Sequence, residues 1–207
     1  FPGSKVGLAS EEMTMAELLK QKNYATAIYG KWHLGDAKQF LPLQQGFDEY
    51  LGIPYYNDMW PVTYDGKPAD SSSNKSKVPQ LPLIKNNDKW IEIKTLEDQS
   101  TLTERYTTAA EAFIKKNKNK PFFLYLPHSM PHVPINASPA FRGKSKQGLY
   151  GDVIQEIDAS VGRILKTIKE NGLDNNTIVI FTSDNGPWIN YGNHAGSTGG
   201  LREGKGT

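Results

Sequence analysis

Three short and largely apolar runs, each ended by turn-forming residues, restrict the possible folds of this chain more than any other feature. They lie at 24–29 (YATAIY), 122–126 (FFLYL) and 177–182 (TIVIFT). A strand that is apolar on both faces has to be covered on both faces, which is typical of parallel sheets. We therefore predict three buried strands in a sheet that carries helices on its two faces.

Amphipathic helices are predicted between these strands. Their apolar residues recur every three or four positions, and a threonine followed three residues later by a glutamate marks two of the beginnings. The predicted helices run from the capping box of Thr14 and Glu17 to about Lys20, from the possible capping box of Thr101 and Glu104 to about Ile114, and from Tyr150 to Ile168 with Gly172 as the stop. This alternation indicates an α/β fold with a mainly parallel sheet sandwiched by helices.

The composition excludes several classes of protein. Lys and Arg number 24 against 22 Asp and Glu, a net charge of +2, which does not favour a nucleic-acid-binding protein. The sequence contains no Cys, which excludes disulfides, thiolate metal sites and a cysteine nucleophile among these residues. No apolar run approaches the roughly 18 residues of a membrane span. Residues 52–99 are rich in Pro, Asn, Ser and Lys without a sustained period, so we predict a surface excursion there.

Each predicted strand is followed directly by residues that can carry chemistry. Ligands of α/β sheets gather at the carboxyl ends of the strands, so we expect these residues to converge. They are Lys31 and His33 after the first strand, His128 and His132 after the second, and Asp184 and Asn185 after the third. The alternative to a functional role is that Lys31 is simply solvated, that the histidines are structural and that Asp184 and Asn185 belong to an ordinary Asp-Asn-Gly turn.

Two of these pairs suggest binding of ions. Lys31 and His33 lie two positions apart, so on an extended segment both could face an anion while Trp32 packs inward. Asp184 and Asn185 offer oxygen ligands, which favour Ca²⁺ or Mg²⁺, although two ligands fall short of the roughly six to eight that calcium takes.

The remaining histidines and the glycine-rich end of the chain suggest other roles. Prolines at 127, 131 and 134 exclude a helix that would align His128 and His132 on one metal, so one of the two is better suited to be a general acid. The residues alone do not decide which. The segment 192–206 could bring backbone amides close to an anion, but its Gly204-Lys205-Gly206 lacks the P-loop spacing of a nucleotide-binding site.

Five ordered blocks of the sequence resemble the sulfatase family, in its arylsulfatase-like branch. The resemblance covers nearly the whole chain except about 60–97. The blocks are GKWHLG at 30–35, QQGFDEYLGIPY at 44–55, FFLYLPHSMPHVP at 122–134, VGRILKTIKENGLDNNTIVIFTSDNGP at 161–187 and GGLREGKGT at 199–207. The resemblance implies an alkaline-phosphatase-like fold and hydrolysis of aryl or carbohydrate sulfate monoesters.

The resemblance also implies roles for individual residues. Lys31 and His33 match the lysine and histidine that contact the sulfate and the nucleophile, and Lys205 matches a sulfate-binding lysine. His132 matches the histidine near the leaving-group oxygen, whereas His128 has no catalytic counterpart. Asp184 and Asn185 match two ligands of the family's Ca²⁺, with Mg²⁺ the less favoured metal. The unmatched loop is the best place for a sugar or aryl contact, or simply for loop packing; its candidates are Tyr56, Asn57, Asp58 and Trp60.

The sequence departs from the family pattern at the nucleophile. The family uses a formylglycine made from Cys or Ser in a C/S-x-P-S-R segment, and two further aspartates complete its metal site. Neither occurs here. The expectation is that residues 1–207 form an incomplete sulfatase catalytic domain, lacking the N-terminal nucleophile segment and the C-terminal subdomain, and that this piece alone is inactive. The alternatives are a phosphoester hydrolase of the same superfamily and a non-catalytic remnant that binds a sulfated glycan. The family resemblance suggests an exported or lysosomal protein.

Overall fold

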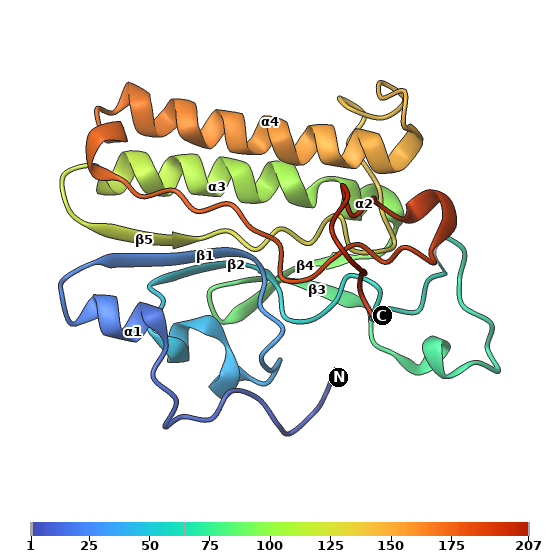
Figure 1. Cartoon of the computed structure of the whole chain (residues 1–207). Coiled ribbons are helices and arrows are strands. Elements are labelled where there is room, and N and C mark those ends of the chain that lie inside the picture. The colour runs from blue at the N-terminus through green and yellow to red at the C-terminus, as the bar shows by residue number, and fades with distance from the viewer. Residues whose placement is uncertain (1, 64, 207) are drawn as a thin grey trace.

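The computed structural model describes residues 2–63 and 65–206 and contains one five-stranded sheet between helices (Figure 1). The strands have the order β4-β3-β2-β1-β5. They are β1 (Ala25–Lys31), β2 (Glu49–Ile53), β3 (Leu81–Lys85), β4 (Asp88–Ile93) and β5 (Phe122–Tyr125). β1 pairs in parallel with β2 and β5, while β3 is antiparallel to both β2 and β4. The predicted α/β class with a parallel core is confirmed.

Helices cover the two faces of the sheet, as Figure 1 shows. On one face lie α3 (Leu102–Asn117) and α4 (Gly148–Glu170), and on the other lies α1 (Met15–Lys20). The larger core lies under α3, where Tyr106, Phe113 and Ile114 are almost fully buried with strand residues such as Ile53. The predicted short, middle and long helices are thereby confirmed, and Gly172 ends α4 in the left-handed conformation at φ +69°.

The helix α2 (Leu96–Ser100) begins at a capping box that the sequence reading misplaced. Thr95 accepts from the backbone N–H of Asp98, and the Asp98 side chain accepts from the backbone N–H of Thr95. Thr101 makes no such bond, because its backbone is already helical (φ −84°, ψ −11°) and its hydroxyl donates to the Asp98 carbonyl. The predicted box of Thr101 and Glu104 is therefore wrong, and that of Thr14 and Glu17 is confirmed.

The stretch 52–99 is only partly a surface excursion. Residues 81–93 form the hairpin β3–β4, which extends the sheet and buries Leu81, Leu83 and Ile93. This hairpin has no clear sequence signal, because Pro82 interrupts β3 and β4 does not alternate: its first three residues, Asp88, Lys89 and Trp90, are all exposed. Pro82 pairs with Glu92 of β4, whereas the register of β3 with β2 covers only Ile84 and Lys85, so the sheet makes no ladder bond on the β2 side of Pro82.

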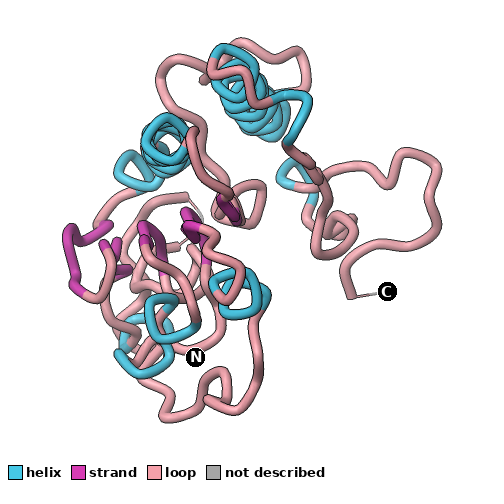
Figure 2. The backbone as a smooth tube through the Cα atoms, turned by 90° about the vertical axis from the view of Figure 1, so that its left-hand side faces the viewer, coloured by secondary structure: helices cyan, strands magenta, loops and turns pink. Residues whose placement is uncertain are grey.

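The apolar run 177–182 is not a strand in the described part of the chain, which corrects the third predicted strand. Ile178, Ile180 and Phe181 are 90%, 82% and 74% exposed. In Figure 2 the chain that follows α4 lies apart from the magenta strands. An apolar run becomes a strand only where a neighbour accepts its backbone hydrogen bonds, and none of the five described strands pairs with this run.

Two glycines allow the centre of the sheet to pack closely. Gly30 of β1 has φ +140°, and a Cβ there would overlap the carbonyl oxygen of Pro127. Gly52 of β2 pairs with Gly30, and its Cβ would overlap the Gly30 carbonyl oxygen. This close approach lets the Lys31 N–H donate to the Pro127 carbonyl at 2.8 Å, which joins the ends of β1 and β5.

We predict that Gly30→Ala lowers the free energy of unfolding by at least about 2 kcal/mol, because backbone atoms must move to admit the methyl group. Gly162→Ala is the matched control, since a Cβ at this position in α4 meets nothing within 4 Å. That control should stabilise the protein by about 0.5–1 kcal/mol through helix propensity. Denaturant unfolding of both variants measures the difference, and equal stabilities would contradict the packing argument.

Candidate functional site

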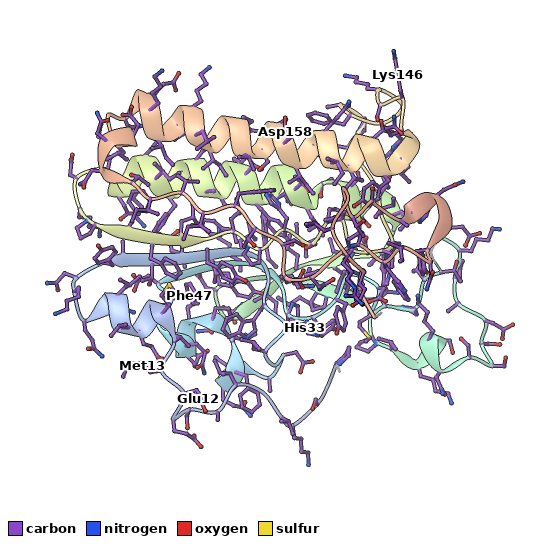
Figure 3. All side chains as sticks on the ribbon, in the orientation of Figure 1. Glu12, Met13, His33, Phe47, Lys146 and Asp158 are labelled. Carbon is purple, nitrogen blue, oxygen red and sulfur yellow. The ribbon has the colours of Figure 1, made fainter. Side chains whose placement is uncertain are left out.

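The end of β1 presents Lys31 and His33 on one side and Trp32 on the other. Trp32 is buried, and its Nε1 donates to the Phe40 carbonyl at 2.8 Å. Trp32 and His33 donate their backbone N–H groups to Ile53 and Pro54, which continues the pairing with β2 beyond the strands. His33 has φ +64° and lies beyond the carboxyl end of β1 (Figure 3). Trp32 packs inward as expected, but the backbone of His33 is left-handed and not extended, so strand alternation does not set the direction of its side chain.

Tyr56, in the loop after β2, lies between the two histidines of the candidate site. Its ring centroid is 3.8 Å from that of His33 in an edge-to-face contact and 5.2 Å from that of His132 in a stacked one. The Nζ of Lys31 is 5.3 Å from the same ring, within the range of a cation–π contact. Tyr56 therefore links side chains that the sequence reading assigned to separate strands.

His132 enters the site from the loop after β5. Its Nδ1 lies 2.7 Å from the carbonyl oxygen of Val133. Because a carbonyl oxygen can only accept, Nδ1 must carry the hydrogen, and Nε2 is the nitrogen left for other chemistry. The structure thus presents His132 with a defined tautomer beside Tyr56.

His128 points elsewhere, toward the helices. Its Nε2 is 3.3 Å from the Ser160 hydroxyl of α4, and its ring is 6.4 Å from that of Tyr106 in α3. Burial lowers the pKa of His128 to about 4, so the ring is neutral near pH 7. The two histidines left open by the residues alone are therefore separated by the tertiary structure.

The segment after α4 carries Asp184 and Lys205, whose charges both act on Lys31. The Lys205 backbone N–H donates to the Pro187 carbonyl at 2.9 Å, and its Nζ lies 5.5 Å from the Trp188 ring. Asp184 is close enough to Lys31 to raise the pKa of that lysine. Asn185 is exposed and follows directly. Thr207, the last residue of the final motif, lies outside the described residues.

The electrostatics of the cluster favour an anion. Burial lowers the pKa values of Lys31, His33 and His132 below their ordinary values, and the positive charge of Lys205 lowers all three further. Asp58 opposes this effect at Lys31 and His132, whose pKa values it raises. Cations gathered in a partly desolvated place repel one another, and a bound anion relieves that repulsion.

The donors near Asp184 fit a hard cation only in part. Asp184 and Asn185 supply oxygen atoms, which is the chemistry that Ca²⁺ and Mg²⁺ prefer. Within residues 2–63 and 65–206, however, no group of three or more His, Cys, Asp or Glu side chains could hold a metal ion. The two residues could form part of a metal site, and the other ligands would have to come from water, substrate or other residues.

The four loop residues predicted for a sugar or aryl contact differ in how deeply they are buried. Tyr56 and Asp58 are half-buried beside the cluster, whereas Trp60 is fully buried in the core and is excluded as a surface contact. Asn57 is also fully buried, and Gln99, which contacts it, carried no sequence signal at all. A fold-level contact between residues 42 positions apart leaves no local pattern.

The α/β sheet and its site define a class: an α/β protein whose ionisable side chains gather beyond the carboxyl ends of the parallel strands, where the ligands of such sheets bind. The comparisons with known proteins agree with this class. The Sulfatase family model matches residues 2–206, and the chain belongs to the sulfatase family.

Named relatives and a solved structure support the assignment. The chain is 37% identical to "Arylsulfatase A" of Homo sapiens over 100% of its own length and 42% of that protein, and 39% identical to "N-acetylgalactosamine-6-sulfatase" of Mus musculus over 97% and 38%. The crystal structure of the PsFucS1 sulfatase from Pseudoalteromonas sp. matches 95% of the chain and 43% of its own length, with a TM-score of 0.83 and 29% identity. The chain therefore spans less than half the length of these relatives.

Proposed function

We propose that the whole protein carrying this sequence hydrolyses sulfate monoesters. The observation that carries the proposal is the convergence of Lys31, His33 and His132 around Tyr56, with the charge of Lys205 close enough to act on all three, in a chain of the sulfatase family. Hydrolysis of such an ester breaks the S–O bond, adds water and releases an alcohol and sulfate. The site has to hold the anion, stabilise the charge that develops on it and protonate the leaving oxygen.

Lys31 and Lys205 hold the sulfate in this proposal. They lie far apart in the sequence, and the positive charge of Lys205 lowers the pKa of Lys31, a repulsion that an anion bound between them would relieve. A preorganised positive charge stabilises the transition state more than the same charge in water, because the site is partly desolvated. His33, whose ring lies against that of Tyr56, supports the same anion.

His132 donates the proton to the leaving oxygen. Its Nδ1–H is committed to the Val133 carbonyl, so the proton comes from Nε2 of the imidazolium. Tyr56 stacks on the ring and restricts its rotation. Asp58 favours the protonated form by raising the His132 pKa.

The proposed mechanism needs two further groups: a metal ion, for which this chain supplies some of the ligands, and a nucleophile, for which it supplies no matching residue. Asp184 and Asn185 would supply some of the ligands of a Ca²⁺ ion, with Mg²⁺ the less favoured metal. The ion would add positive charge beside the sulfate. A formylglycine would supply the nucleophile, and no residue of this sequence matches its C/S-x-P-S-R segment.

The substrate class we propose is a sulfated small molecule or glycan. Support comes from the relatives, one of which is named for a sulfated amino sugar. No helix within the described residues is long and apolar enough to cross a membrane. Export or delivery to a lysosome remains a prediction from the family resemblance.

We predict that the whole protein hydrolyses 4-nitrophenyl sulfate and loses this activity when Ca²⁺ is chelated, whereas the 207-residue chain alone shows no turnover. The assay compares both proteins on 4-nitrophenyl sulfate and 4-nitrophenyl phosphate, with and without EDTA. Faster turnover of the phosphate would favour a phosphoester hydrolase. Saturable binding of a sulfated sugar by the whole protein without any hydrolysis would instead favour a binding protein.

A further inference from the structure

The loop that carries His132 is held by a buried side chain that the proposed mechanism does not use. Asn57 follows β2 and is 0% exposed. Its Nδ2 donates to the carbonyl oxygen of His132 at 2.9 Å and to that of Pro134 at 3.2 Å. One amide group therefore joins the loop after β2 to the loop after β5.

Asn57 is itself held from α2 by Gln99, which is 1% exposed. The Nε2 of Gln99 donates to the Asn57 carbonyl, and its Oε1 lies 3.5 Å from the Asn57 Nδ2. Buried amides that lose their partners cost roughly 1–3 kcal/mol each, so this arrangement resists displacement. The two amides form a fixed support behind the catalytic loop.

The support acts on the backbone of the residue that donates the proton. The His132 ring is restricted by Tyr56 and by the Val133 carbonyl, but neither contact fixes the position of the His132 backbone. The bond from Asn57 to the His132 carbonyl does so directly. A displacement of about 1 Å at a reacting group can cost on the order of 10²-fold in rate.

We propose that Asn57, supported by Gln99, is a positioning residue for proton transfer by His132. The inference rests on the proposed sulfate ester hydrolysis and on the role of His132 in it. Asn57 touches no reacting atom and acts only through the loop. Its loss should therefore slow the step in which the leaving oxygen is protonated, and affect the binding of sulfate much less.

The leaving group distinguishes a positioning role from a purely structural one. An alkyl sulfate needs a proton on its leaving oxygen, whereas 4-nitrophenolate leaves without one. In the whole protein, we expect Asn57→Ala to lower kcat for an alkyl sulfate by about 10- to 100-fold. The kcat for 4-nitrophenyl sulfate and the KM of both esters should change less than about 3-fold. Gln99→Leu should act in the same direction with a smaller loss.

Asn136→Ala is the matched control. Asn136 belongs to the same loop, and its Nδ2 donates to the Leu96 carbonyl at 2.7 Å, so the variant loses an equivalent bond to α2 without touching His132. It should lower the unfolding midpoint and reduce both activities equally. Equal losses on both esters in Asn57→Ala would overturn the positioning role.

Two further outcomes are decisive. If Asn57→Ala does not fold, the ratio of alkyl to aryl turnover in Gln99→Leu decides the question, and an unchanged ratio overturns the proposal. A wild-type protein that hydrolyses neither ester overturns the proposed function itself. A wild-type protein that hydrolyses both esters, with the same ratio of alkyl to aryl turnover in the variants, overturns only the positioning role.

Discussion

His132→Ala should lower kcat/KM of the whole protein for an alkyl sulfate by about 10²–10⁴-fold, the range that a positioned general acid contributes. The same variant should keep most of its activity on 4-nitrophenyl sulfate, whose leaving group needs no proton. The Nδ1–H bond to Val133 leaves Nε2 as the ring nitrogen that donates the proton, and the variant removes this donor. Turnover of the two esters under identical conditions measures the effect.

His128→Ala is the control for this result. It removes a histidine from the same proline-rich loop, but one that faces Ser160 and not the site. Any loss should arise from lower stability and be equal for both esters. A selective loss on alkyl sulfates in His128→Ala, with none in His132→Ala, would reverse the assignment of the two histidines.

The pH profile gives a second readout of His132. Burial lowers its pKa below 6.5, and the residue must be protonated to act as an acid. Activity on alkyl sulfates should therefore fall as the pH rises through that lowered pKa. Asp58→Asn removes a carboxylate that raises the His132 pKa, so this limb of the profile should move to lower pH. A shift to higher pH would contradict the proposed electrostatics.

Lys31→Ala and Lys205→Ala should each lower kcat/KM for every sulfate ester by about 10²–10³-fold, because each removes a preorganised charge at the oxyanion. Unlike His132→Ala, neither variant should distinguish alkyl from aryl esters. Both lysines act on the sulfate itself, which all the substrates share.

Lys118→Ala is the matched control, since this exposed lysine follows the last residue of α3, away from the cluster. It should leave kcat/KM unchanged. Abundant turnover by Lys205→Ala would contradict the assignment of this residue to the site. If Lys31→Ala and Lys205→Ala keep the unfolding midpoint of the wild type, their loss of activity does not come from a loss of folded protein.

Much of the fold could be predicted locally. β1 and β5 are continuous apolar runs, and the helix α4 repeats its apolar residues over many turns, so each element is specified by its own segment. The hairpin β3–β4 could not be predicted, because Pro82 and the charged residues of β4 weaken its pattern and its pairing with β2 supplies the missing stability. The run 177–182 failed in the opposite way: it has strand character but no described strand to pair with.

The sequence by itself determined the family and the α/β class, and it predicted which residues would hold an anion, because these depend on residue type, order and spacing. The family resemblance favoured His132 over His128, but only the tertiary structure shows that His132 lies beside Tyr56 while His128 faces Ser160, since the two lie four positions apart on a loop with no regular period. It also placed Tyr56 between two histidines and Asn57 behind one of them. Such contacts join segments up to 77 positions apart, and chain closure over that distance leaves no trace in local sequence patterns.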